Sequence, residues 1–307
     1  MRRNRAINTV VDVAVALLVV GIAVVALSTA NFSDDPEQDR FDTDRTATVL
    51  GTATFDVSYT VEPVLAEAAE TSEAIEYDEG EAQEQRIAHG PVATHLGDAA
   101  IGKLAIDSEQ VTGTGQQYQS AIDRRFRSQL SGSQFETRVT AHWEPYPDAS
   151  ISGKATVGVE PPPNRDIRTR ELTVPSGFDR VRGDAISAVE DGGGYGAIAE
   201  IVASTIVDGY LPVVESKQAL ERDGSSMVLT QYRYERLATL LDGAAVEDVR
   251  EEIEQTDADP AEANEELIAA LATRLEPELR QNFESPRAAA RSVSTGTITL
   301  IVRTWDP

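Results

Sequence analysis

The chain has few side chains of the types that most often carry out chemistry, and their spacing favours no reaction. His89, His95 and His142 are its only histidines, and it has no cysteine. His89 and His95 are six positions apart, which suits neither one face of a helix nor the spacing of a helical metal pair. We interpret the three histidines as structural or surface residues. Without cysteine there is no disulfide, thiolate metal site or thiol nucleophile.

Two glycine-rich stretches could bind an anion. GDAAIGKL (97–104) comes close to a phosphate-binding loop, but Leu104 stands where that motif needs a hydroxyl for magnesium, and the stretch looks helical. DGGGYG (191–196) could present backbone amides to an anion, yet such a run is more typical of a joint before a helix. We interpret it as a joint, which could be a hinge between two parts of the chain.

The remaining chemical candidates are better explained by packing and solvation. Trp143 and Trp305 lie near the ends of predicted strands, where core or edge packing is expected rather than a ligand platform. A glutamate stripe with three-residue spacing (Glu67, Glu70, Glu73, Glu76) is expected to be a solvated face rather than a cation site. The nucleophile motifs G-x-S-x-G and S-x-x-K are absent. Paired carboxylates for glycoside hydrolysis stay open, because acids are abundant throughout the chain.

Strand and helix patterns occupy different parts of the chain. Alternation of apolar and polar residues predicts strands at 46–61, 134–146, 149–160, 166–174 and 295–305. The second and third of these form a hairpin joined by PYPDA. Apolar residues at helical spacing predict helices within 90–106, within 116–130 and over most of 183–291.

The clearest helix signal lies near the C-terminus. Asp259 is a predicted N-cap with Pro260 in the first turn. Four leucines at intervals of four predict a buried stripe: Leu267, Leu271, Leu275 and Leu279.

These patterns predict an α+β fold, in which an N-terminal transmembrane helix precedes an extracellular domain with a mainly antiparallel sheet and a large helical insertion. The expected division is a transmembrane helix or signal anchor over 1–30, an acidic linker over 31–45 and the domain over 46–307. Within the domain, 176–292 is expected to be mainly helical and 293–307 to be a closing strand.

The charge excludes one class of partner. The net charge is −25, from 52 acids against 27 lysines and arginines, and no basic block follows the N-terminus. We therefore expect no nucleic-acid partner. Lysine occurs only at Lys103, Lys154 and Lys217. Acids spread along a lysine-poor chain resemble the surfaces of proteins from extreme halophiles, with an acidic protein that meets a basic partner as the alternative.

The N-terminus has the pattern of a membrane anchor. Arg2, Arg3 and Arg5 precede an apolar run, and acids follow it, which predicts a cytoplasmic N-terminus and an extracellular remainder. The run 13–30 would span about 27 Å as a helix, close to a hydrocarbon core of roughly 30 Å. We expect a single pass through the cell membrane, with lipid around the following residues: Val13, Leu17, Leu18, Gly21, Val24 and Leu27.

Retention of this segment is one of two alternatives. Ser28-Thr29-Ala30 resembles a signal-peptide cleavage site, and cleavage after Ala30 would release a secreted protein. Asn31 opens the sequence Asn31-Phe32-Ser33, a candidate site for glycosylation.

Asp12 is the unusual residue of the anchor. If the span begins at Val13, Asp12 lies at the cytoplasmic interface and needs no function. The alternative is that Asp12 pairs with a cation on a neighbouring helix. The segment resembles the N-termini of archaeal type IV pilin-like proteins, with RRNRA as a basic leader and cleavage after Ala6. Asp12 would then be the sixth mature residue, where that family has a glutamate at the fifth.

A second resemblance covers more of the chain. RAINTVVDVAVALL and HWEPYPDASISGKATVGVEPPP resemble an uncharacterised family of haloarchaeal single-pass membrane proteins, and this implies an association with pilus or secretion-type machinery. We therefore expect a membrane-anchored extracellular structural or assembly protein, not an enzyme and without cofactor or metal. Its expected partners are membrane lipid and other pilin-like or envelope proteins. The alternative is a tethered or secreted extracellular binding or enzymatic domain of unknown ligand.

Overall fold

The computed structural model describes residues 51, 53–71, 85–130, 135–222, 224–241, 246–254 and 258–307. The chain from Thr43 onward forms one compact unit, and every element named below belongs to it. The expected anchor over 13–30, Asp12 and the sequon at Asn31 lie outside the described residues.

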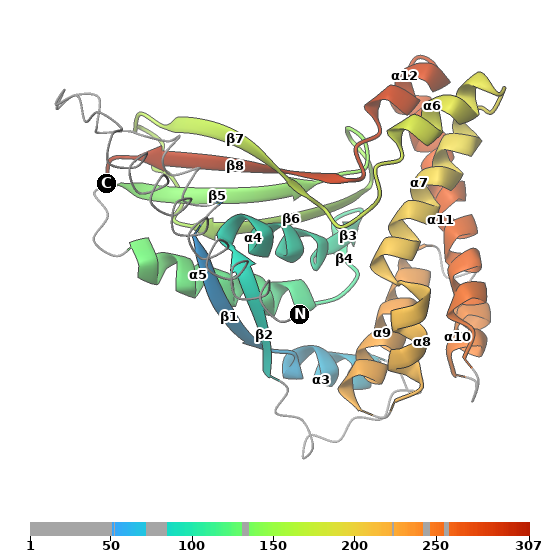
Figure 1. Ribbon diagram of the computed structural model, residues 1–307, viewed down its shortest axis with the longest axis horizontal. Helices are drawn as coiled ribbons and strands as arrows, with labels where there is room; N and C mark the ends of the chain where they lie inside the picture. Colours follow the sequence, from blue (N-terminus) through green and yellow to red (C-terminus); the bar gives the residue numbers. More distant parts are fainter. Residues whose placement is uncertain are drawn as a thin grey trace, which may run out of the picture. The chain divides into compact units, whose positions relative to one another are not determined.

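The described strands form two separate antiparallel sheets (Figure 1). A two-stranded sheet pairs β1 with β2, and a six-stranded sheet has the order β4-β3-β6-β5-β8-β7. The strands are β1 (Thr54–Thr60), β2 (Gln85–Pro91), β3 (Leu104–Ile106), β4 (Glu109–Gln110), β5 (Glu136–Trp143), β6 (Ile151–Gly158), β7 (Arg168–Pro175) and β8 (Thr297–Trp305). The expected α+β class with antiparallel sheets is confirmed.

The helices fall into two groups along the chain. Those before β7 are α3 (Glu62–Thr71), α4 (Val92–Ile101) and α5 (Thr114–Leu130). Those between β7 and β8 are α6 (Arg182–Glu190), α7 (Tyr195–Tyr210), α8 (Val213–Leu220), α9 (Ser225–Leu240), α10 (Val246–Glu254), α11 (Pro260–Asn282) and α12 (Pro286–Ser292). We call α6–α12 the helical part, and the strands with α3–α5 the sheet part.

The sheet part has three layers, with α4 and α5 between the two sheets (Figure 1). Strands β5 and β6 alternate buried and more exposed residues, as expected when one face packs on helices and the other meets solvent. Helix α4 lies between two layers and is buried on most of its surface. Its end approaches β6 so closely that a Cβ on Gly153 would lie 2.3 Å from the Ala100 carbonyl oxygen, so only glycine fits there.

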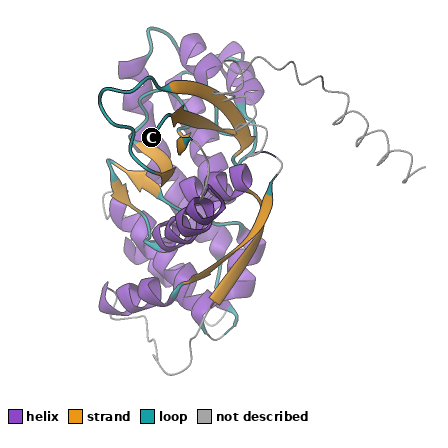
Figure 2. Cartoon of the chain, turned by 90° about the vertical axis from the view of Figure 1, so that its left-hand side faces the viewer, coloured by secondary structure: helices purple, strands orange, loops and turns teal. Residues whose placement is uncertain are grey.

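The helical part is built around the pair α7 and α11. Figure 2 looks from the side of the sheet part, with strands in orange in front of helices in purple. Asp259 caps α11 by accepting hydrogen bonds from the backbone of Ala261 and Glu262. The four leucines of the predicted stripe are completely buried, and the helix continues through Pro277. The cap and the stripe are therefore confirmed.

Two short connections join the helical part to the sheet part, at residues 176–181 and 293–296. They are tied to each other and to β5. Trp143 donates from Nε1 to the Thr295 carbonyl oxygen at 2.7 Å, and Ser176 Oγ donates to the same oxygen at 2.7 Å. Thr295 Oγ1 in turn donates to the Asp179 carbonyl oxygen. The connections are therefore held by buried hydrogen bonds rather than left as open loops.

Two of the sequence-based predictions are wrong. Residues 191–194 of DGGGYG join α6 to α7 inside the helical part, so this joint is no hinge between two parts of the chain. A Cβ on Gly193 would lie 2.7 Å from the Ala188 carbonyl oxygen, because the two helices turn closely there. The helix predicted within 90–106 ends at Ile101, and Leu104–Ile106 form β3 because they pair with β6.

Among the described residues, one stretch, Tyr195–Leu220, is apolar and long enough to cross a membrane. It comprises α7 and α8, which are interrupted at Leu211 and Pro212. One face of α7 is buried and packs against α11, with Ile198, Val202 and Ile206 completely buried. We therefore assign α7 to the core of the helical part, whereas α8 has only Ser216 buried.

Candidate functional site

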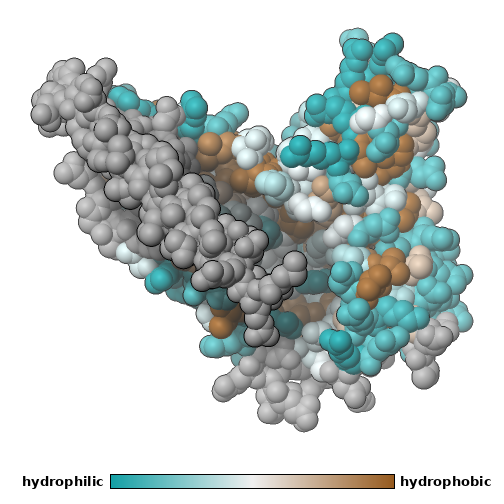
Figure 3. Space-filling view, viewed as in Figure 1, coloured by the Kyte–Doolittle hydropathy of each residue, from teal (hydrophilic) through white to brown (hydrophobic). Residues whose placement is uncertain are grey.

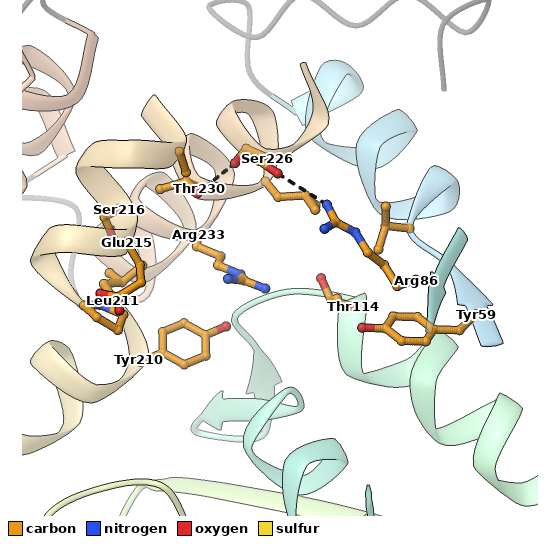
Figure 4. A pocket seen from close by; sticks show the side chains of 14 residues that line it. Tyr59, Arg86, Thr114, Tyr210, Leu211, Glu215, Ser216, Ser226, Thr230 and Arg233 are labelled. Atoms are coloured by element: carbon orange, nitrogen blue, oxygen red, sulfur yellow. Dashed lines mark hydrogen bonds between the residues drawn. The ribbon is translucent and has the colours of Figure 1, made fainter. Parts of the chain in front are cut away.

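A pocket of about 300 Å³ lies where the sheet part meets the helical part. Its walls come from β1, β2 and the start of α5 on one side, and from the end of α7, α8 and α9 on the other. Figure 4 shows that side chains from both sides point into this space. Small-molecule sites are usually concave, with a few polar groups that converge from different elements, so we take this junction pocket as the candidate site.

On the sheet side, Tyr59 and Arg86 are direct partners in the register of β1 and β2. Opposite residues of an antiparallel pair project on the same face of the sheet, so the phenol and the guanidinium enter the pocket together. The Tyr59 ring packs on the Tyr118 ring of α5, with the ring centroids 4.8 Å apart. The sheet wall is therefore held by α5 from behind.

A buried hydrogen-bonded chain supports this wall. His95 Nε2 lies 2.9 Å from the Phe55 carbonyl oxygen, and its Nδ1 lies 2.6 Å from the Tyr118 hydroxyl. Because a carbonyl only accepts, Nε2 donates to Phe55, and Nδ1 shares a second hydrogen bond with the Tyr118 hydroxyl. His95 is 1% exposed and both of its nitrogens are satisfied. Its role is structural, as expected from the sequence.

On the helical side, Ser226, Thr230 and Arg233 follow at intervals of four and three residues along α9 and share one face. Arg233 Cζ lies 5.9 Å from the centroid of the Tyr210 ring, within range of a cation–π contact. Arg86 Nη2 donates to Ser226 Oγ at 3.4 Å, which joins β2 to α9 across the pocket (Figure 4).

The electrostatics of the pocket differ from those of the protein as a whole. Burial raises the pKa of the Tyr59 phenol, and the positive charges of Arg86 and Arg233 act in the opposite direction. Both guanidiniums are thus close enough to affect one phenol. In a chain of net charge −25, two cations face the same small space, with Glu215 also among the lining residues.

Two other contacts hold the junction. Residues Val61, Val64 and Leu65 of the β1–α3 segment pack with Val228 and Tyr232 of α9 in a small apolar cluster separate from the main core. The second contact lies on α11, where Glu278 accepts hydrogen bonds from the hydroxyls of Tyr146 and Ser150 and from the Ser150 backbone.

The structure separates the remaining chemical candidates. His89 pairs with Asp56 on the exposed face of the β1–β2 pair, and His142 lies 3.5 Å from Glu144 in β5 and the loop after it. GDAAIGKL covers the end of α4 and the first residue of β3, where Lys103 Nζ donates to Gln119. No strand-loop-helix phosphate site is present at these residues.

The two tryptophans are core residues. Trp143 and Trp305 are 0% and 1% exposed, so the expectation of packing is confirmed and a ligand platform is excluded for both. In the part of the chain that the structure describes, no three His, Asp or Glu side chains gather at a distance that would hold a metal ion.

Sequence reasoning did not find Tyr59, Arg86 or Arg233. They lie on three different elements, and no local motif links them. The pairing of β1 with β2 and the packing of α3 on α9 bring them together. The one local signal is YRYER (232–236), in which arginines alternate with aromatic residues on α9.

The fold and the pocket define an α+β protein with a polar pocket between an antiparallel sheet part and a helical part. The chain belongs to a family of unknown function, DUF7284, whose match covers residues 11–305. Neither a curated protein nor a solved structure matches the chain.

Proposed function

We propose that this chain is a membrane-anchored extracellular binding protein whose junction pocket takes a small ligand. The observation that carries the proposal is the pocket of about 300 Å³, into which polar side chains converge from both parts of the domain. A flat or filled junction would instead have favoured a purely structural domain. The anchor and the orientation come from the apolar run and its basic and acidic flanks.

The pocket favours binding over catalysis. Ser226 accepts from Arg86, and no carboxylate or imidazole pairs with it among the described residues. A serine nucleophile needs such a base within hydrogen-bond reach. The lining is instead rich in hydrogen-bond donors and in rigid aromatic surface. These groups suit a ligand that is bound and released without a reaction.

The proposal is tested by asking whether the pocket retains a compound. The full chain is purified from its own membranes in detergent, and compounds released from it are identified by mass spectrometry. The matched variant is Ala219→Phe, because Ala219 lines the pocket on α8 and a larger side chain would fill it. A compound that wild type retains and the variant lacks supports the proposal. Identical compounds from both proteins would contradict it.

A second candidate function rests on the N-terminus: a pilin-like accessory component of a surface or secretion machine. It is favoured by the basic leader and by Asp12 near the start of the apolar run. Mass spectrometry of the mature N-terminus tests it. A chain that begins at Ile7 supports pilin-type processing, and an intact Met1 contradicts it. A chain that begins at Asn31 would be a secreted protein without an anchor.

A further inference from the structure

We infer that the ligand of the junction pocket carries an oxyanion, either a carboxylate or a phosphate, which Arg233 holds from the helical side and Arg86 from the sheet side. This inference rests on the proposed function and adds the chemical class of the ligand. The two guanidiniums approach from α9 and from β2, so the anion would join the two parts of the domain.

Arg233 of α9 lines the pocket without a carboxylate partner among the described residues. It is half-buried, its Nε is buried without a hydrogen-bond partner, and no carboxylate lies within 4 Å of it among the described residues. Arg236, Arg250 and Arg274 are also half-buried, and each pairs with a carboxylate. The Arg236 Nε is likewise buried without a partner, so the missing carboxylate is what distinguishes Arg233. The chain has 52 acids, yet none of the described carboxylates pairs with Arg233.

A guanidinium that loses part of its hydration without an acceptor costs free energy. For Arg233, no carboxylate among the described residues compensates this loss of hydration. Its charged end points toward the pocket beside Tyr210 and Thr114 (Figure 4). An anion that binds there would give the terminal Nη groups of Arg233 an acceptor and a counter-charge, while its Nε stays buried. Planar, forked guanidiniums fit carboxylates and phosphates in particular, because two parallel N–H groups reach two oxygens.

The other polar groups of the pocket support the same class. Arg86 is held by Ser226 and adds a second positive charge. The Tyr59 hydroxyl is protonated at neutral pH, as tyrosine ordinarily is, and can donate to an anion. Burial raises its pKa further. Thr114 supplies a further hydroxyl at the centre of the view in Figure 4. These groups converge as hydrogen-bond donors beside two positive charges, an arrangement that complements an anion better than a neutral ligand.

The rest of the lining limits the size and charge of the ligand. Leu211, Leu229 and the Tyr210 ring give it apolar surface, so the ligand can carry a short apolar body. The volume of about 300 Å³ is at the lower end of the range for small-molecule pockets. Glu215 would repel a second negative charge on the α8 side.

The test uses three probes on the full chain in detergent at one fixed high ionic strength: benzoate, its uncharged analogue benzamide, and inorganic phosphate. Binding is measured by titration calorimetry for wild type, Arg233→Gln and Arg86→Gln. The matched control is Arg303→Gln, because Arg303 is exposed on β8 away from the pocket lining. Thermal unfolding of each variant verifies that it is folded.

We expect benzoate or phosphate to bind wild type and to bind Arg233→Gln roughly ten- to hundredfold more weakly. Arg303→Gln should bind as wild type does, and benzamide at least about tenfold more weakly than benzoate. Arg233→Lys should fall between wild type and Arg233→Gln, since it keeps the charge and loses the fork. Tighter binding of benzoate assigns a carboxylate ligand, and tighter binding of phosphate assigns a phosphate.

The outcomes separate this inference from the proposed function. If benzamide binds as tightly as benzoate and Arg233→Gln changes nothing, the pocket binds ligands and the oxyanion class is wrong. If no probe binds but wild type retains an uncharged compound that Ala219→Phe lacks, the oxyanion class is again wrong. If that retained compound is an anion, it supports the oxyanion class. If no probe binds and both proteins retain the same compounds, both proposals fail.

Discussion

At the scale of single residues, Asn264 organises the wall behind the pocket. It is 2% exposed, and its amide nitrogen donates to Asp208 Oδ1 at 3.1 Å and to the Leu211 carbonyl oxygen at 2.9 Å. Its amide oxygen accepts from the Tyr234 hydroxyl at 2.8 Å. One buried side chain thus joins α11 to α9 and to the end of α7, where Leu211 lines the pocket.

Tyr234→Phe tests this network through its dependence on pH. At neutral pH we expect a loss of about 1–2 kcal/mol, because the buried amide oxygen of Asn264 loses its donor. Burial raises the pKa of Tyr234 to about 12 from an ordinary value of about 10. The stabilisation from the protonated phenol is therefore fully present below pH 10 and is lost as the pH rises toward 12.

Urea unfolding of wild type and Tyr234→Phe at several pH values measures this effect. The difference in unfolding free energy should be constant below pH 10 and shrink above it. A difference that stays constant up to pH 12 would show that Tyr234 does not titrate in the folded protein as we describe.

At the scale of elements, α11 is determined by its own sequence at both its start and its face. The cap, the proline in the first turn and the leucine spacing are all local signals, and each gives the observed structure. Its C-terminal half carries the side chains that contact the sheet part. Arg274 pairs with Asp107, and Glu278 binds the loop between β5 and β6.

Removing the cap tests the start of α11. Asp259→Ala should lower the unfolding free energy by about 1 kcal/mol, because the first-turn amides of Ala261 and Glu262 lose their acceptor. Asp259→Asn keeps an acceptor oxygen and serves as the matched control, with a change within a few tenths of a kcal/mol. Denaturant unfolding measures both. Equal losses in the two variants would mean that charge, rather than capping, stabilises this end.

Glu278→Ala tests the contact between α11 and the sheet part. It leaves the completely buried Tyr146 hydroxyl and the Ser150 groups without their acceptor, so we expect a loss of about 2–3 kcal/mol. Glu278→Gln keeps one acceptor oxygen and should lose less. Hydrogen exchange should show faster opening of residues 144–150 in Glu278→Ala. Unchanged exchange there, with the same global loss, would place the effect elsewhere.

The elements that the sequence did not predict depend on distant partners. Strand β2 was not expected, because GPVATHLGDAAIGKLAI reads as a helix and the residues before it are acidic and polar. It forms because Thr60 pairs with Gln85 and Thr54 with Pro91, across the intervening α3. The pocket was missed for the same reason, since Tyr59 and Arg86 meet only through this pairing. Local patterns predict α11 and the β5–β6 hairpin, whose pairing needs few intervening residues.

At the scale of the whole molecule, the acidic surface should make stability depend on salt. Among the residues that Figure 3 colours by hydropathy, hydrophilic ones predominate, and hydrophobic ones form separate patches. With a net charge of −25, self-repulsion rises as the ions that screen it are removed. We expect Tm to fall steadily as the salt concentration is lowered, by roughly 2–4 °C for each kcal/mol lost.

Thermal unfolding in potassium chloride and in sodium chloride, from molar to millimolar concentrations, measures this dependence. The two salts should act alike, because screening depends on ionic strength. A Tm that does not change with salt would show that repulsion between the surface acids does not lower the stability of the fold.

The position of the helical part between β7 and β8 has a consequence for how this architecture could vary. The two strands are antiparallel neighbours, and Pro175 lies opposite Thr297 where the chain leaves the sheet and returns to it. In topological terms, α6–α12 occupy the loop of a β-hairpin. A short turn between Pro175 and Thr297 would close the six-stranded sheet without moving a strand. Relatives could therefore enlarge or exchange the helical part and keep the strand order, while every such change would rebuild one wall of the pocket.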